Sequence, residues 1–100
     1  MKKISQDDAK KVLSEVMHPE INYNLVDLGM IDEVVIRENK VSLTLKLPLL
    51  EVPIKDYLIQ ITKEALINLQ EDLEVEVKLD QMSQQERDKF MKKAKEGWKF

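Results

Sequence analysis

Residues 41–47, which read VSLTLKL, carry the clearest structural signal in this chain. Valine and leucine at the odd positions alternate with serine, threonine and lysine at the even positions. A two-residue period of this kind is typical of a strand with one face in the core and the other in water. Pro48 follows directly and ends the strand, because proline cannot donate a ladder hydrogen bond. We therefore expect four core side chains from this strand: Val41, Leu43, Leu45 and Leu47.

Two further strands are predicted, one before and one after this segment. In residues 33–37, valine and isoleucine at the even positions alternate with Glu, Val and Arg at the odd positions. Residues 38–40 then make a tight turn to the next strand, in which Asn39 is suited to a positive φ. Residues 73–80, LEVEVKLD, repeat the alternation and form the third strand. This strand is expected to add two core residues: Val75 and Val77.

Three helices are predicted around these strands. Ser5 caps the first helix with Asp8 as a weak partner, and Pro19 ends it, because proline disfavours the α conformation in the residue before it. Pro53 opens the second helix, which links the second and third strands and so makes them parallel, with a right-handed crossover. The third helix begins at the capping box of residues 83–86. One side of this last helix is expected to carry Phe90, Met91, Ala94 and Trp98.

The order of elements predicts an α+β fold. A helix-strand-strand-helix-strand core is followed by a C-terminal helix, and a small mixed three-stranded sheet carries its helices on one face. The chain of 100 residues is expected to form a single domain, 1–100, because two separate cores would each be too small to offset their chain entropy.

Composition argues against most catalytic and cofactor-binding sites. The chain has no cysteine, one histidine (His18) and two glycines. These counts exclude a thiolate nucleophile, a thiolate metal site, a P-loop, a dinucleotide fingerprint and the Gly-x-x-Gly clamp of a KH domain. Nothing in the spacing around His18 suggests a serine triad. We therefore expect no enzymatic activity, no cofactor and no resident metal.

Charge and hydropathy bear on location and partners. A formal net charge of −3 argues against a nucleic-acid surface, which needs a dense basic stripe. No apolar run approaches the roughly 20 residues of a membrane span, and the first residues lack the apolar region of a secretory signal. We expect a cytoplasmic protein that binds neither nucleic acid nor membranes.

Residues 18–31, HPEINYNLVDLGMI, form a loop that is long for a segment without periodicity, and such loops often carry function. As a functional loop, it would present the Asp27 carboxylate on a rigid turn to a metal, a cluster or a partner. As a covering loop, it would plug one end of the core, with Asp27 capping a turn and Gly29 taking a positive φ. The residues taken alone favour the covering loop. Its plugging residues would be Leu25, Val26 and Leu28.

The same loop is similar to a family signature. Pro-Glu at residues 19–20 and Asn-x-Val-Asp-Leu-Gly-Met-Ile at residues 24–31 resemble the iron–sulfur cluster assembly proteins related to SufT and PaaD. They also resemble the N-terminal domain of Mrp/ApbC-type cluster-carrier ATPases. The resemblance continues through the hairpin, Pro53 and the third strand, and residues 82–87 are similar to the segment after this domain in the ATPase branch. It implies the fold described above and an association with cluster maturation.

Two departures from the family pattern bear on chemistry. Family members often carry aspartate before the Pro-Glu pair, where this chain has His18. Many also carry a cysteine before the proline that opens the second helix, where this chain has Val52. A thiolate there would be a natural cluster ligand, because iron sites favour sulfur. Valine cannot ligate iron, so the resemblance does not imply direct cluster binding.

The resemblance implies a non-catalytic accessory or adaptor in iron–sulfur cluster assembly and in the maturation of iron–sulfur proteins, with carrier or recipient proteins as partners. The alternative is a cofactor-free interaction domain of another multiprotein complex or metabolic pathway. A weaker hypothesis is a metal site made by His18, Glu20 and Asp27. A homodimer is a further possibility. The partner surface would combine the loop with the start of the second helix. Its candidate residues are Glu20, Asn24, Asp27, Gly29, Val52, Pro53 and Lys55.

Overall fold

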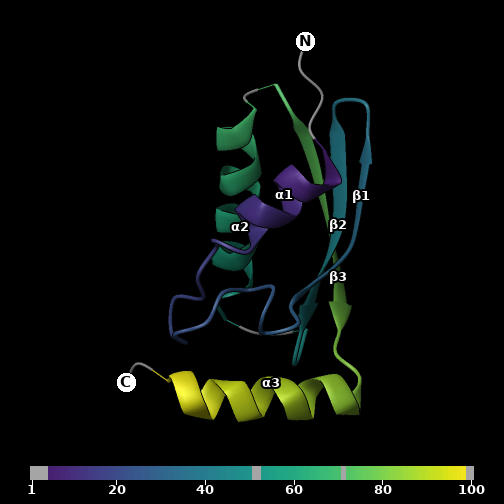
Figure 1. Cartoon of the computed structure of the whole chain (residues 1–100). Coiled ribbons are helices and arrows are strands. Elements are labelled where there is room, and N and C mark those ends of the chain that lie inside the picture. Colours follow the sequence, from purple (N-terminus) through teal and green to yellow (C-terminus); the bar gives the residue numbers. More distant parts are fainter. Residues whose placement is uncertain (1–4, 51–52, 71, 99–100) are drawn as a thin grey trace.

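The computed structural model describes residues 5–50, 53–70 and 72–98 and contains a mixed three-stranded sheet. Strand β2 (Lys40–Leu47) lies in the centre, between β1 (Ile31–Arg37) and β3 (Glu74–Gln81). Strand β1 runs antiparallel to β2, and β3 runs parallel to it (Figure 1). The predicted α+β fold is confirmed.

The apolar side chains of the central strand, β2, are buried as their alternation predicts, whereas those of β3 are buried less completely. All four predicted core residues of β2 are buried, because this strand has a neighbour on each side and helices over one face. Val75 and Val77 of β3 are only half-buried, so their predicted full burial is wrong. Strand β3 is an edge strand, and an edge strand lacks the second neighbour that would cover its side chains.

The hairpin of β1 and β2 contains two residues with positive φ, Glu33 (50°) and Glu38 (52°). Glu33 lies where the register shifts between Asp32 and Val35, which makes a β-bulge. Glu38, and not Asn39 as predicted, takes the positive φ of the turn. The Asn39 carbonyl instead accepts a hydrogen bond from the Glu74 N–H (2.8 Å) and so joins the turn to the start of β3.

Helix α1 (Gln6–Leu13) begins at the predicted Ser5–Asp8 capping box, but it ends well before Pro19. The predicted end is wrong because the following backbone makes a tertiary pairing instead of helical hydrogen bonds. Leu25 N–H donates to the Val16 carbonyl (2.9 Å), and His18 N–H donates to the Tyr23 carbonyl (3.1 Å).

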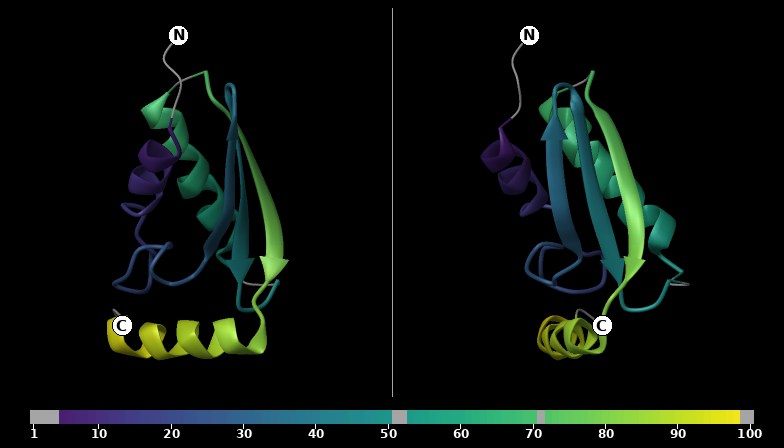
Figure 2. Two further views of the ribbon diagram at one scale, coloured as in Figure 1. Left: turned by 45° about the vertical axis from the view of Figure 1, so that its right-hand side comes forward. Right: turned by 90° about the vertical axis from the view of Figure 1, so that its right-hand side faces the viewer.

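Helix α2 (Lys55–Leu69) links β2 to β3 and packs with α1 over the same face of the sheet (Figure 2). Pro53 lies in the turn just before α2 and not in its first turn. Leu58, Thr62 and Leu66 point into the core, and the Thr62 hydroxyl donates to the Leu58 carbonyl (2.7 Å). Within the described ranges, no helix is long and apolar enough to cross a membrane.

Helix α3 (Gln84–Gly97) lies across the end of the sheet where β2 and β3 finish, and it runs from there beneath the loop and the layer formed by α1 and α2 (Figures 1 and 2). Its predicted capping box, Ser83 with Glu86, is present. Phe90 and Ala94 are buried as expected. Met91 and Trp98, predicted on the same side, are 47% and 51% exposed, because a single helix lying across the sheet end buries only a narrow stripe.

Candidate functional site

The long loop before β1 is built around one tight turn. The Asn24 side chain accepts a hydrogen bond from the Asp27 N–H (2.8 Å) through Oδ1 and donates to the Asp27 carboxylate (2.9 Å) through Nδ2. The N–H of Leu28 donates to the Asn24 carbonyl (3.1 Å). Asn24 therefore caps this turn, a task that the sequence had suggested for Asp27, whose side chain lies exposed.

The turn ends at Gly29, whose φ is 75°. The space around its Cα is open, so the requirement for glycine comes from the backbone conformation and not from crowding. This confirms the expected positive φ. Leu25 and Leu28 are buried in the core as plugging residues, whereas Val26 is 39% exposed, so its predicted burial is wrong.

Helix α3 is fastened to this loop by its last two turns. The Asn22 N–H donates to the Gly97 carbonyl (2.6 Å), and the Tyr23 hydroxyl donates to the Glu96 carboxylate (3.1 Å). That hydrogen bond raises the pKa of Tyr23 above its usual value. The Lys93 ammonium group donates to the Asp27 carbonyl (2.5 Å). Loop and helix, which lie far apart in the sequence, thus form one end of the molecule.

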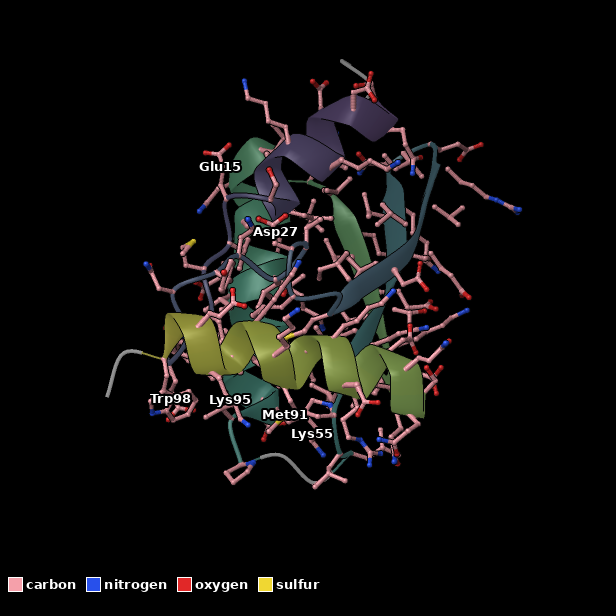
Figure 3. The ribbon with its side chains drawn as sticks, turned by 60° about the horizontal axis from the view of Figure 1, so that its bottom comes forward. Glu15, Asp27, Lys55, Met91, Lys95 and Trp98 are labelled. Carbon is pink, nitrogen blue, oxygen red and sulfur yellow. The ribbon has the colours of Figure 1, made fainter. Side chains whose placement is uncertain are left out.

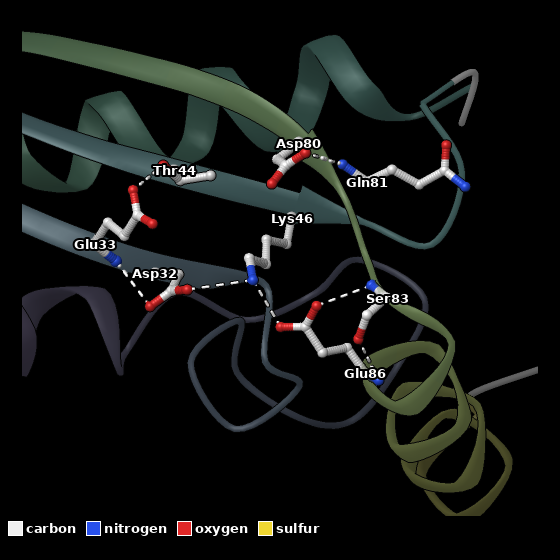
Figure 4. Close-up of polar contacts among 8 residues, drawn as sticks. All are labelled: Asp32, Glu33, Thr44, Lys46, Asp80, Gln81, Ser83 and Glu86. Carbon is white, nitrogen blue, oxygen red and sulfur yellow. Dashed lines mark hydrogen bonds and ion pairs between the residues drawn. The ribbon is translucent and has the colours of Figure 1, made fainter.

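The first turn of α3 is tied to the sheet through Lys46 (Figure 4). Its ammonium group lies 2.7 Å from the Glu86 carboxylate and 3.3 Å from the Asp32 carboxylate. The second Glu86 oxygen accepts the Ser83 N–H (2.9 Å). The hydrogen bond from Lys46, helped by that from Ser83, lowers the pKa of Glu86 to about 2. The same contact with Glu86 raises the pKa of Lys46.

On one side of α3 lies a charged hollow with a volume of about 370 Å³, here called the loop-side hollow. Asp27 and Gly29 line it together with lysines and glutamates of the helix, so its charges are mixed. The residues that line it within the described part of the chain are Asp27, Leu28, Gly29, Glu86, Lys89, Lys92, Lys93 and Glu96.

On the other side of α3 lies a more apolar depression with a volume of about 460 Å³, here called the apolar groove. The start of the loop, the end of β2, the residue before α2 and one side of α3 contribute to it. Leu49 and Leu50, both well exposed, directly follow the groove residue Pro48. The described residues that line it are His18, Glu20, Ile21, Pro48, Ile54, Phe90, Met91, Ala94, Lys95 and Trp98.

The structure divides the predicted partner surface between these two depressions. Glu20 lines the apolar groove, beside Ile54, the residue before Lys55. Asp27 and Gly29 line the loop-side hollow. Figure 3 shows Asp27 on one side of α3 and Lys55 on the other.

The remaining predicted residues lie near these depressions or outside the description. Asn24 holds the turn that leads to Asp27, and Pro53 is exposed just before α2. Val52 lies outside the described residues. The sequence interpretation missed the contribution of Met91, Lys95 and Trp98, because an amphipathic helix does not reveal which element it will pack against. The half-apolar, half-basic character of α3 is the signal that was available.

The weaker hypothesis of a metal site made by His18, Glu20 and Asp27 gains no support from the structure. Among the described residues, no group of three or more histidine, aspartate and glutamate side chains is placed to hold a metal ion. The His18 Nδ1 atom accepts the Glu20 N–H (3.0 Å) and so stabilises the Pro19 turn. An aspartate carboxylate could accept the same hydrogen bond, which explains how histidine can replace aspartate at this position.

Comparison with solved structures supports the fold. A domain of unknown function, DUF59, from Bacillus anthracis superposes with a TM-score of 0.70 at 21% identity over 81% of each chain. A conserved hypothetical protein from Thermotoga maritima superposes with a TM-score of 0.69 at 23% identity, over 90% of this chain and 97% of the other. No curated protein compared with the chain is similar enough in sequence to match.

The sequence itself matches a family model described as iron–sulfur cluster assembly protein, over residues 6–79. The match includes the loop with its Asn24–Gly29 turn and ends before α3, so the helix that closes both depressions lies outside it. With three quarters of its residues inside this match, the chain belongs to the iron–sulfur cluster assembly protein family.

Proposed function

We propose that this protein is a non-catalytic, cytoplasmic adaptor that binds a carrier or recipient protein of iron–sulfur cluster assembly through the apolar groove. The observation that carries the proposal is the combination of an apolar lining with large side chains that stay half exposed, Met91 and Trp98. Apolar patches of this kind, rimmed by polar residues, mark protein interaction sites. Membership of the family supports a role in cluster assembly.

Charges near the groove favour a particular kind of partner. Lys95 lines it, and Lys55 lies on the same side of α3 (Figure 3), whereas Glu20 is the one carboxylate among the lining residues that the structure describes. A partner segment with bulky apolar side chains flanked by carboxylates would complement this arrangement, because the apolar contacts supply affinity and the charges supply orientation.

The groove residues also favour binding over catalysis. The one histidine, His18, uses Nδ1 to accept the Glu20 N–H. A base that activated a nucleophile would need to be oriented toward a serine or a water molecule by a third group. Among the described residues that line the groove, none is a serine, threonine or cysteine.

The test replaces Met91 by glutamate and measures the activity of iron–sulfur enzymes in a strain that lacks the gene. We expect Met91→Glu to fold normally, because the side chain is half exposed and the new carboxylate lies one helical turn from Lys95. It should nevertheless fail to restore enzyme activity, because a charge would enter the apolar contact. Ile67→Glu is the matched control, since Ile67 is also an exposed apolar residue on a helix but lies at the far end of α2.

Full rescue by Met91→Glu would contradict binding through the groove. If the wild-type gene itself does not change iron–sulfur enzyme activity, the alternative applies, and the chain serves another multiprotein complex. Asp27→Asn tests the loop side in the same assay. It keeps an oxygen that can accept from Asn24, so loss of rescue with unchanged stability would assign the partner contact to the loop-side hollow instead.

A further inference from the structure

We propose that Gly97, the last residue of α3, is a positioning residue for the apolar groove. Its lack of a side chain lets the end of the helix close onto the ring of Tyr23, and this contact brings the two walls of the groove together. The inference deepens the proposed function, on which its consequence for partner binding rests. Its effect on the shape of the groove does not depend on any partner.

The apolar groove has two walls that come from distant parts of the sequence. The loop contributes His18, Glu20 and Ile21, and the opposite wall is the second half of α3 with Trp98 after it. The loop wall lies inside the family match over residues 6–79, whereas the helix wall lies outside it. The two walls meet at an antiparallel bridge between Ile21 and Trp98. The groove therefore depends on the contact between the end of α3 and the loop.

Gly97 lies too close to the loop to carry a side chain. A β-carbon in ideal geometry at this position would lie 2.8 Å from Cδ2 and 2.9 Å from Cε2 of the Tyr23 ring, and 3.2 Å from the Asn22 nitrogen. The first two distances are well below the optimal separation of two carbon atoms, about 3.5–4.0 Å. The requirement for glycine here comes from crowding, in contrast to Gly29, where the surrounding space is open.

Neither neighbour of Gly97 can move away without losing a contact. The Tyr23 hydroxyl donates to the Glu96 carboxylate (3.1 Å), and the Lys93 ammonium group lies 6.0 Å from the centroid of the same ring. The Asn22 N–H donates to the Gly97 carbonyl (2.6 Å), so a shift of this backbone would break the hydrogen bond that holds the end of the helix. We therefore expect a β-carbon at position 97 to open the contact between loop and helix.

The first test uses Gly97→Ala, for which helix preference and the tertiary contact predict opposite results. Alanine favours a helix over glycine, so a helix end without the loop contact would be stabilised. We expect instead a lower melting temperature, Trp98 emission at a longer wavelength, and exchange of the Asn22 amide hydrogen at least about tenfold faster. A melting temperature at or above that of wild type with unchanged Asn22 exchange would overturn the proposal.

The Glu74 amide hydrogen is the internal control for overall stability. It is bonded to the Asn39 carbonyl (2.8 Å) at the start of β3, the opposite end of the sheet from α3 (Figure 1). If Gly97 positions loop and helix, exchange should accelerate at Asn22 and stay near its wild-type rate at Glu74. Equal acceleration at both amides would show that Gly97 supports only the stability of the whole fold, and would overturn the positioning role.

The second test asks whether the Tyr23 ring is what Gly97 accommodates. Tyr23→Ala removes the ring, whereas Tyr23→Phe keeps it and removes only the hydroxyl that binds Glu96. Adding Gly97→Ala should accelerate Asn22 exchange about tenfold in the Tyr23→Phe background and less than about threefold in the Tyr23→Ala background. Each comparison is made within one background, so the effect of the Tyr23 substitution itself cancels. The same acceleration in both backgrounds would overturn the fit between Gly97 and the ring.

Rescue of iron–sulfur enzyme activity in the deletion strain connects the shape of the groove with its proposed use. Gly97→Ala should lose rescue, because the loop wall no longer meets the helix wall. Loss of rescue with Met91→Glu but full rescue with Gly97→Ala would overturn the positioning role and leave the proposed function in place. Full rescue with both variants would overturn binding through the groove and with it the role of Gly97 in binding.

Discussion

The two sides of α3 differ in the contacts that they make with the rest of the molecule. On the loop side, the helix gives hydrogen bonds and ion pairs: Lys93 binds the Asp27 carbonyl, and Glu86 binds Lys46. On the groove side, it leaves Met91 and Trp98 half exposed over an apolar lining. Polar contacts to backbone groups attach the helix, whereas exposed apolar area adds nothing to the stability of the monomer. The difference indicates that polar contacts attach α3 on the loop side, whereas on the groove side Met91 and Trp98 leave apolar area exposed to solvent.

The largest effect is expected at Phe90, the buried residue next to Met91 in the sequence. Phe90→Ala would leave a cavity in the core under α3 and should lower the free energy of unfolding by about 3 kcal/mol. Met91→Ala should change it by less than about 0.5 kcal/mol, because the side chain is half exposed. Urea unfolding monitored by circular dichroism measures both. Similar losses for the two variants would show that the Met91 side chain is also part of the structural core.

A smaller effect is expected on the loop side, at Gly29. With φ at 75°, Gly29→Ala should lower the free energy of unfolding by about 1–2 kcal/mol, because an L-residue is strained in the left-handed region. Gly29→Asn is the control and should cost less, since asparagine tolerates that conformation and the surrounding space is open. Equal losses for the two variants would point to a steric cause and not to the backbone angle.

The smallest effect is expected from the contact between Lys46 and Glu86, both partly exposed to solvent. The Glu86 pKa is about 2 in the folded protein, below its usual value near 4.5. A carboxyl group with a lowered pKa stabilises the fold above its usual pKa, and that contribution is lost as the pH falls through the folded value. Wild type should therefore lose this stabilisation between about pH 4.5 and pH 2.

Lys46→Met should be less stable than wild type at neutral pH, and the difference should shrink across that acidic window. Thermal unfolding at a series of pH values measures the difference. Fluorescence of Trp98, the one tryptophan, reports the attachment of α3. Lys40→Met is the control, because its ion pair with Glu76 joins β2 to β3 and does not involve α3. A constant difference between wild type and Lys46→Met at all pH values would show that Lys46 acts through packing alone.

Local sequence patterns correctly predicted the features that depend on residues adjacent in the sequence. The alternation of residues 41–47 predicted a strand and its buried face, and Ser5 and Ser83 marked both capping boxes. The positive φ of Gly29 was also foreseeable, because glycine stood between a loop and a strand. Strand burial was overestimated at Val77, since a period of two shows which face is apolar but not whether the strand lies at an edge.

The candidate site depended on contacts between residues that are far apart in the sequence. The early end of α1 follows from the pairing of Val16 and His18 with the loop, which competes with continued helix. The division of the predicted surface follows from the position of α3, whose hydrogen bonds to Asn22, Tyr23 and Asp27 span more than sixty residues. No local pattern encodes such a placement.

Local sequence was enough to specify the α+β class, the element order and the family, because hydrophobic period, capping residues and the loop motif are properties of short segments. The position of α3, and with it the separation of the loop-side hollow from the apolar groove, emerged only from long-range packing. The same packing left one edge of the sheet open. The physical reason is that the local sequence of an amphipathic helix or an alternating strand specifies only its apolar face. Which other element covers that face is decided by the packing of the whole folded chain.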